Sequence, residues 1–230
     1  MIKRGVTVAD RTGTWVVVAA YNEGKVIREV VAELVHEGWS VVVVDDGSSD
    51  DTAASAGAPG VHVVTHPINL GQGAALQTGI EYALRHGARY IVTFDADGQH
   101  DAACIPTLIT ALGDADIALG SRFLGKEIEG ASTRRIALLK TATVVSNTLS
   151  GMKLTDAHCG FRAFRAAAAP KLVITQDRMA HASELLRKIK TSKLRVVEVP
   201  VTVRYTEHSM SKGQGGFQAV RILFDYFFRA

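Results

Sequence analysis

The sequence predicts an α/β fold, in which helices flank a mostly parallel, mixed sheet, within one domain spanning residues 1–230. Short apolar runs rich in β-branched residues alternate with segments whose apolar residues recur at helical spacing. The runs lack polar alternation, as expected for strands buried on both faces of a parallel sheet. This pattern is typical of a doubly wound sheet, which binds its ligands where the strands end.

Residues 14–120 carry the regular part of the pattern, with an expected helix after most expected strands. Strands are expected at 14–20, 40–44, 61–65, 89–94 and 116–119. Helices are expected at 23–37, 73–86 and 101–112, with a short one ending near 56. Gly38 is the expected C-cap of the first helix, and Asp101 is the expected N-cap of the last one.

After residue 120 the pattern loosens into a polar loop and a long expected helix at 132–149. An apolar–basic alternation at 161–165 and a helix at 180–189 follow. One or two strands are expected at 194–203, with a break at Pro200. The last expected helix, 217–228, is apolar and aromatic around much of its circumference. It is too short to span a bilayer but could lie in a membrane interface, the alternative being a helix packed on the core.

An acidic turn follows the strand that ends near Phe94. Asp95 and Asp97 would point to the same side if the strand persisted, because side chains alternate along a strand. Together with Gln99 and His100, these carboxylates suit a hard divalent cation that is also bound by substrate phosphates. The alternative is an ordinary surface turn, since Asp-Gly is a favourable turn dipeptide.

Several acidic or glycine-rich turns fall at the carboxyl ends of the expected strands. They cover residues 21–23, 45–51, 69–73 and 95–100. Parallel strands end at one edge of a sheet, so these turns can converge on a single crevice. Their coincidence is stronger evidence for a site than any one of the motifs.

The charge is distributed unevenly along the chain. Residues 1–120 contain 7 Lys+Arg and 15 Asp+Glu, whereas residues 121–230 contain 19 and 8. An acidic half followed by a basic half indicates different partners for each, with an anionic one facing the second. A basic solvated surface is the alternative. Aromatic residues are too sparse among the basic ones to favour nucleic acid.

Cysteine content and hydropathy indicate where in the cell the protein is expected. The two cysteines, Cys104 and Cys159, form neither a disulfide framework nor a metal-ligand cluster, which favours a reducing cytosol. No signal peptide and no apolar segment of the ~20 residues needed to span a bilayer are evident. The expected location is the cytoplasm, peripheral at the cytoplasmic face of a membrane.

Six motifs occur in order along the chain. They are Ala20-Tyr21-Asn22-Glu23, Asp45-Asp46-Gly47-Ser48-Ser49-Asp50, Asn69-Leu70-Gly71-Gln72-Gly73-Ala74, Asp95-Ala96-Asp97-Gly98-Gln99, Gly120-Ser121-Arg122 and Cys159-Gly160-Phe161-Arg162. Together they resemble the motifs of family 2 glycosyltransferases, and most closely those of the dolichyl-phosphate mannose synthase and polyprenyl-phosphate glucosyltransferase branch. The resemblance covers about residues 14–215. It implies a GT-A fold, with a Rossmann-like nucleotide-sugar and metal-binding half at 14–120 and an acceptor-binding half at 121–215.

The resemblance also implies roles for individual residues on the donor side. The donor would be a nucleoside diphosphate sugar, GDP-mannose or a UDP-hexose, and the cofactor would be Mg²⁺ or Mn²⁺. Asp97 and Gln99 would be the principal metal ligands, with Asp95 binding the nucleotide and approaching the metal. The other nucleotide-sugar-binding residues would be Ala20, Tyr21, Glu23, Asp45, Asp46 and Asn69. Helix capping by Asp45 and Asp46, and a turn-forming role for Asn69, are the alternatives.

The family's acceptor is a polyprenyl phosphate, such as a dolichyl or undecaprenyl phosphate. Candidates to bind its phosphate are Arg122, Arg134 and Arg135, with Lys212 on a loop that could close over the donor diphosphate. Arg135 could instead be a solvated helix residue. Asp156 is the candidate base, although a phosphate monoester is mostly dianionic at neutral pH and needs orientation more than proton removal. Glu184 is a weaker candidate, expected to face solvent or to pair with Arg187 or Lys188.

The sequence therefore predicts an inverting, metal-dependent hexosyltransferase that acts on a polyprenyl phosphate. A separate membrane-anchoring partner is possible, because many relatives continue into transmembrane helices where this chain stops. One alternative is transfer to a glycan, protein or small molecule. A dinucleotide-binding oxidoreductase is another, opposed by the absence of Gly-x-Gly-x-x-Gly after the first strand. A non-catalytic nucleotide-sugar or lipid-binding protein is a third.

Overall fold

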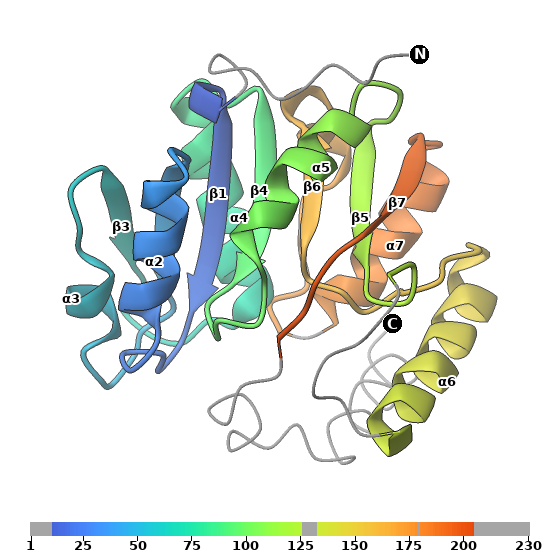
Figure 1. Ribbon diagram of the computed structural model, residues 1–230, viewed down its shortest axis with the longest axis horizontal. Helices are drawn as coiled ribbons and strands as arrows, with labels where there is room; N and C mark the ends of the chain where they lie inside the picture. Colours follow the sequence, from blue (N-terminus) through green and yellow to red (C-terminus); the bar gives the residue numbers. More distant parts are fainter. Residues whose placement is uncertain (1–10, 126–132, 179, 205–230) are drawn as a thin grey trace.

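A computed structural model describes residues 11–125, 133–178 and 180–204 of the chain. Its centre is a seven-stranded mixed sheet with the order β3-β2-β1-β4-β6-β5-β7, flanked by helices (Figure 1). The strands are β1 Thr14–Ala20, β2 Ser40–Asp45, β3 Val61–Thr65, β4 Tyr90–Asp95, β5 Ile117–Ser121, β6 Arg162–Arg165 and β7 Val196–Pro200. The helices are α2 Ile27–His36, α3 Thr52–Ala56, α4 Gln72–Arg85, α5 Ile105–Ala111, α6 Thr133–Ser150 and α7 His181–Thr191, with 3-10 turns η1 Ala102–Cys104 and η2 Ala166–Lys171.

Burial on both faces explains why the strands read as continuous apolar runs. Val16 and Val18 of β1 pack with the buried sides of α2 and α5 on one face of the sheet. Val17, between them, packs with α4 and α7 residues on the other face. Successive side chains of a strand point to opposite faces, so both sets must be apolar when helices cover both faces. The prediction of a helix-flanked, mostly parallel sheet is confirmed.

One strand runs against the others within the described sheet. β6 is antiparallel to both β4 and β5, while β5 pairs in parallel with β7. Two reversals leave β5 parallel to β4, so the carboxyl ends of β1, β2, β4 and β5 lie at the same edge. The turns that follow these strands therefore lie at the same edge, as predicted, while their convergence on a single crevice stays a prediction. β6 brings the loop before Arg162 to that edge as well.

Two predicted helices were wrong at their starts, for identifiable reasons. The helix expected from residue 23 begins at Ile27, because residues 24–26 form a turn, beside which the backbone N–H groups of residues 23 and 24 bind side chains of the 48–52 loop. Glu23 N–H donates to Thr52 Oγ1 at 2.8 Å, and Gly24 N–H donates to Asp50 Oδ2 at 3.1 Å. The helix expected at 101–112 opens as η1 before α5. Asp101 caps η1 as predicted, accepting Ala103 N–H at 3.0 Å.

Helix α2 ends beside Gly38 as predicted, but its C-cap is Glu37 and Gly38 is the residue that follows the cap. The φ of Gly38, +78°, is a conformation that glycine adopts without steric cost, and Trp39 N–H closes the turn onto Leu34 O at 3.2 Å.

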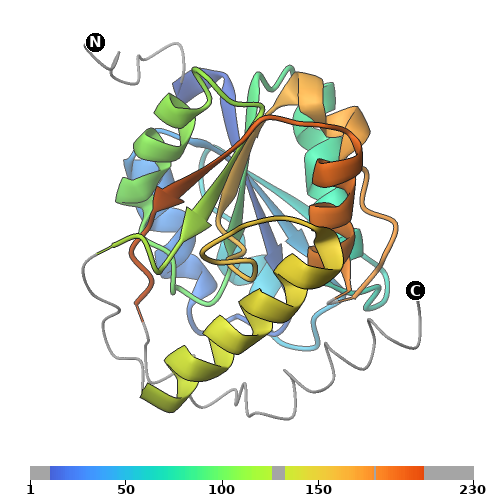
Figure 2. The same ribbon diagram turned by 90° about the vertical axis from the view of Figure 1, so that its right-hand side faces the viewer.

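Helix α6 differs from the other long helices in its packing. It contacts α7 and stands at the outer edge of the body beside the carboxyl end of the sheet (Figure 2). None of the helices among the described residues is long and apolar enough to cross a membrane. The expected helix at 217–228 and Lys212 lie outside the described residues.

Candidate active site

A cavity of about 70 Å³ opens at the carboxyl end of β4. It is lined by residues that were predicted to serve two different roles, metal binding and acceptor-phosphate binding. Its wall is formed by Asp95, Asp97, Gln99, His100, Arg122, His158, Cys159, Gly160 and Val203. The three predicted metal ligands and one predicted phosphate-binding arginine therefore share a cavity, even though Arg122 lies in the other half of the chain.

The acidic turn is shaped by its own backbone. β4 ends at Asp95, so strand alternation does not continue to Asp97, and a turn brings the two carboxylates to the same cavity instead. Gly98 has φ +72°, and Asp97 Oδ1 accepts Gln99 N–H at 3.0 Å. Across the turn, a Cβ on Gly160 would lie 2.8 Å from both carboxylate oxygens of Asp95. Only glycine at 160 lets this loop pass the carboxylate so closely.

Asp95 and Asp97 differ in their electrostatics. Burial raises the pKa of Asp95, but the contact with His100, whose Nε2 lies 2.9 Å from Oδ2, and the charge of Arg162 outweigh burial, so its pKa is below the usual value. Burial and the neighbouring Asp95 charge raise the pKa of Asp97 to about 6. The pair thus contains one firmly ionised carboxylate and one whose negative charge is disfavoured.

These residues fit a hard divalent cation. Two carboxylates and the amide of Gln99 offer the oxygen ligands that Mg²⁺ and Mn²⁺ prefer. A cation between them would relieve the repulsion that raises the pKa of Asp97. Within residues 11–125, 133–178 and 180–204, no group of three His, Cys, Asp or Glu residues could hold a metal. Further ligands would therefore come from a bound phosphate group or from water.

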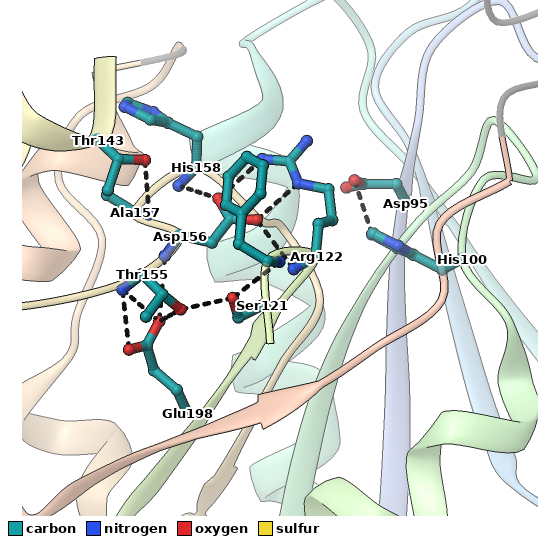
Figure 3. A network of polar contacts seen from close by, with 11 residues as sticks. Asp95, His100, Ser121, Arg122, Thr143, Thr155, Asp156, Ala157, His158 and Glu198 are labelled. Carbon is teal, nitrogen blue, oxygen red and sulfur yellow. Dashed lines mark hydrogen bonds and ion pairs between the residues drawn. The ribbon is translucent and has the colours of Figure 1, made fainter. Parts of the chain in front are cut away.

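Arg122 is fixed by Asp156 in a two-pronged ion pair (Figure 3). Its Nε and Nη2 donate to Asp156 Oδ2 and Oδ1 at 2.6 and 2.8 Å, and its backbone N–H also donates to Oδ2 at 3.2 Å. Burial raises the pKa of Asp156, but the hydrogen bonds and charge of Arg122 outweigh burial and bring it below its usual value. Asp156 is thus an ionised carboxylate whose two oxygens orient Arg122.

The remaining predicted nucleotide-binding residues lie outside this cavity. Asp46 is buried, and its Oδ1 lies 2.8 Å from His66 Nδ1. Its carboxylate also accepts Leu70 N–H and Gly71 N–H at 3.0 and 2.7 Å. Asp45 accepts Ser48 N–H at 3.2 Å. Both carboxylates therefore stabilise the loops that follow β2 and β3. Ala20 is buried at the end of β1, Glu23 is half-buried, and Tyr21 and Asn69 are exposed.

The remaining predicted acceptor residues are more distant or undescribed. Arg134 is exposed on the first turn of α6 and does not line the cavity. The side chain of Arg135 and the whole of Lys212 lie outside the described residues. The two arginines of α6 and Lys212 therefore stay predictions.

Glu184 departs from its prediction in one respect. It pairs with Lys188 at 2.6 Å as expected, but it is buried and does not face solvent. Its carboxylate accepts Thr175 N–H and Gln176 N–H at 3.0 and 2.9 Å. The segment that it anchors packs on the start of α4, where Gly73 N–H donates to Asp177 O at 2.6 Å. Glu184 thus anchors a loop between the two halves.

Sequence reasoning missed the structural role of His100 and did not identify Glu198. His100 was considered only as a neighbour of the acidic motif, yet it is buried, stacks on Phe161 at 4.7 Å and binds Asp95. Glu198 was not considered, yet it binds the backbone next to Asp156. Its signal is a charged residue within an otherwise apolar strand.

The fold and the cavity define a class of enzyme, and comparison with known proteins agrees. Residues 15–173 match the model of the family described as Glycosyl transferase family 2. The chain belongs to the family 2 glycosyltransferases. It is an enzyme of the GT-A fold, and the predicted family and fold are confirmed.

Two relatives illustrate the family. Polyprenol monophosphomannose synthase of Mycolicibacterium smegmatis is 32% identical over 91% of this chain and 84% of its own length. UDP-N-acetylglucosamine–dolichyl-phosphate N-acetylglucosaminyltransferase of Methanococcus voltae is 32% identical over 94% of this chain and 93% of its own. Both names describe transfer to a polyprenyl phosphate, so this chain is similar to enzymes that act on such acceptors.

A solved structure supports the fold. Glucosyl-3-phosphoglycerate synthase of Mycobacterium tuberculosis, crystallised with Mn²⁺, uridine diphosphate and phosphoglyceric acid, superposes with a TM-score of 0.69. It covers 96% of this chain and 81% of its own at 19% identity. At that identity the likeness shows a shared fold alone, and that enzyme's acceptor is not a lipid.

Proposed function

We propose that this glycosyltransferase moves a hexose from a nucleoside diphosphate sugar to a polyprenyl phosphate, with inversion at the anomeric carbon. The observation that carries the proposal is the meeting of an acidic, oxygen-rich wall and an oriented arginine in one cavity. The acidic wall suits a cation bound to the donor diphosphate, and the arginine suits an acceptor phosphate. In such an arrangement the cation compensates the charge of the donor and the arginine compensates the charge of the acceptor, so the two anionic substrates can approach each other.

On the donor side, Asp95, Asp97 and Gln99 bind Mg²⁺ or Mn²⁺ together with the diphosphate of GDP-mannose or a UDP-hexose. The cation, when bound, supplies charge stabilisation to the departing nucleoside diphosphate. The base and sugar are bound along the neighbouring turns by Ala20, Tyr21, Glu23 and Asn69, on loops that Asp45 and Asp46 stabilise. This assigns residues 14–120 to the donor and residues 121–215 to the acceptor.

On the acceptor side, Arg122 presents its guanidinium to the acceptor phosphate while Asp156 fixes its orientation. Arg134, Arg135 and Lys212 add positive charge along the path of the lipid phosphate. The phosphate oxygen attacks the anomeric carbon as the bond to the diphosphate breaks. A phosphate monoester has its second pKa near about 6 and is mostly dianionic at pH 7, so the attack needs no base. The low pKa of Asp156 agrees with an orienting role.

Helix α6 supports a lipid acceptor. Its exposed side chains include Leu138 and Val144, which are 41% and 64% accessible. Its sequence contains Arg134, Arg135 and Lys140 but no acidic residue. An apolar and basic surface of this kind fits acyl chains and anionic headgroups.

The helix also adjoins the cavity. Thr143 Oγ1 accepts Ala157 N–H at 3.3 Å, and Lys140 Nζ lies 5.5 Å from the ring centre of Phe123. We therefore propose a peripheral position at the cytoplasmic face of a membrane, with a membrane-anchoring partner as a further possibility.

Transfer of a labelled sugar to lipid tests this function. The purified enzyme is incubated with labelled GDP-mannose or a labelled UDP-hexose, Mn²⁺ or Mg²⁺, and a polyprenyl phosphate in detergent. Label in an organic-extractable, metal-dependent product is expected. Label confined to the aqueous phase would contradict the lipid acceptor and favour a glycan or small-molecule acceptor.

A further inference from the structure

Glu198, in the middle of β7, directs its carboxylate to the backbone of residues 155 and 156. Both oxygens accept Thr155 N–H at 2.9 Å, and Oε1 also accepts Asp156 N–H at 3.1 Å. The Thr155 hydroxyl donates to Oε1 at 2.8 Å. A single half-buried carboxylate thus receives three donor groups from two consecutive residues.

The acceptor-only character of the carboxylate sets the direction of a longer network (Figure 3). Because Thr155 donates its hydroxyl to Glu198, the Ser121 hydroxyl, 2.6 Å away, donates to Thr155 Oγ1. Ser121 Oγ then accepts Phe123 N–H at 3.2 Å. The two residues that flank Arg122 in sequence are therefore fixed by hydrogen bonds that lead back to Glu198.

The same carboxylate acts on Arg122 from a second direction. It binds the backbone N–H of Asp156, whose side chain binds Arg122 through both oxygens. Arg122 is thus positioned through its neighbours in sequence and through its ion-pair partner, and both routes begin at Glu198. Glu198 is absent from the cavity wall itself.

We propose that Glu198 is a positioning residue that fixes the Arg122 guanidinium for the acceptor phosphate, an inference that rests on the proposed function. Phosphate recognition by arginine depends on the orientation of its planar fork. Substitution of Glu198 should therefore weaken acceptor binding and leave donor binding intact, because the residues proposed for the donor lie within residues 14–120, outside this network.

Glu198→Gln is the direct test. It preserves size but replaces one acceptor oxygen with an NH₂ group that faces backbone N–H donors. Its KM for a short-chain isoprenyl monophosphate is expected to rise about ten-fold, as for loss of a hydrogen bond to a charged group. Its donor KM should stay within about two-fold of the wild type. Glu198→Asp, which keeps the charge, should recover part of the loss.

Asp116→Asn provides a matched control on the same two strands. Asp116 precedes β5 and accepts three hydrogen bonds from Arg195, which precedes β7, at the opposite edge of the sheet. Like Glu198→Gln, this variant weakens a carboxylate contact between distant segments, but one outside the network. It should leave both KM values unchanged. A rise in acceptor KM equal to that of Glu198→Gln would mean that strand stability alone is responsible.

A double-mutant cycle tests whether the effect passes through Arg122. In an Arg122→Lys background, Glu198→Gln should raise the acceptor KM by less than about two-fold further. Additive effects of the two substitutions, or equal rises in acceptor and donor KM, would overturn the proposal.

Hydrogen exchange separates this inference from the proposed function. The amides of Thr155 and Asp156 should exchange faster in Glu198→Gln than in wild type or Asp116→Asn, with no change at Gln99. Unchanged exchange at both amides would overturn the positioning role, whatever the acceptor is. Faster exchange in an enzyme that transfers no sugar to isoprenyl phosphate would support the anchoring contact and refute the lipid acceptor.

Discussion

The loops after β2 and β4 are both acidic, yet they use their carboxylates differently. After β2, Asp46 is buried against His66 and accepts two backbone N–H groups of the 70–71 segment. After β4, Asp97 accepts one N–H within its own turn and lines a cavity. An aspartate that binds several distant N–H groups builds a loop, whereas one in a cavity beside a second carboxylate is available to a cation. Arg122, across that cavity, faces them from the basic half.

Among substitutions that test this difference between the two loops, the largest loss of turnover is expected at Asp97. Asp97→Asn removes the negative charge but preserves size, so turnover should fall by at least about 100-fold with little change in thermal midpoint. Initial rates at saturating Mn²⁺ and thermal unfolding would measure both. Glu81→Gln, on the exposed side of α4, is the control and should retain full activity. Unchanged turnover in Asp97→Asn would rule out its role as a metal ligand.

Arg122→Lys should have the next largest effect. Lysine keeps the positive charge but loses the fork that binds both oxygens of Asp156, so acceptor KM should rise about ten-fold at an unchanged donor KM. Arg195→Lys is a matched control, because Arg195 also binds an aspartate through two nitrogens but lies away from the cavity. If the two variants gave the same kinetics, Arg122 would have no particular function in acceptor binding.

Asp46→Asn should affect stability more than chemistry. One of its oxygens would become an NH₂ group facing backbone donors, at a cost of about 1–3 kcal/mol in unfolding free energy. Urea unfolding of Asp46→Asn and Asp97→Asn in parallel would measure the difference in their unfolding free energies. A stable Asp46→Asn protein with a strongly raised donor KM would instead support direct nucleotide binding.

Glu184 is another carboxylate with a structural role, and the pH dependence of stability tests that role. Burial raises its pKa, but the hydrogen bonds from Lys188, Thr175 and Gln176 outweigh burial and lower the pKa from 4.5 to about 2. A lowered folded-state pKa means that its stabilisation is complete above about pH 4.5 and is lost as the pH falls toward 2. The unfolding free energy of Glu184→Gln should therefore decline less than that of wild type over this range. Parallel curves would contradict the assignment.

The regular part of the fold could be predicted because its signals are local. β1 and β3 have the predicted bounds. β1 is buried along almost its whole length and is a continuous apolar run, whereas β3 is partly exposed and is recognised by its β-branched residues. The family motifs likewise led to Asp95, Asp97, Gln99 and Arg122, which share the cavity.

The rest depended on contacts between distant residues. The segment before α2 binds side chains of the 48–52 loop, more than 20 residues away. The reversed direction of β6 is set by its pairing with β4 and β5. Glu198 binds residues 42 and 43 positions earlier in the chain. No local sequence pattern encodes these contacts. The sequence alone therefore could not show which acidic residues stabilise the fold and which serve the site.

The central claim is that one cavity takes its donor chemistry from the acidic turn and its acceptor chemistry from Arg122. Calorimetric titration of Asp97→Asn and Arg122→Lys, each with a nucleoside diphosphate plus Mn²⁺ and with an isoprenyl monophosphate, tests it directly. A crossed result is expected, in which Asp97→Asn loses metal-dependent nucleotide binding and Arg122→Lys loses phosphate binding. Loss of the same ligand in both variants, or of neither ligand in either one, would contradict it.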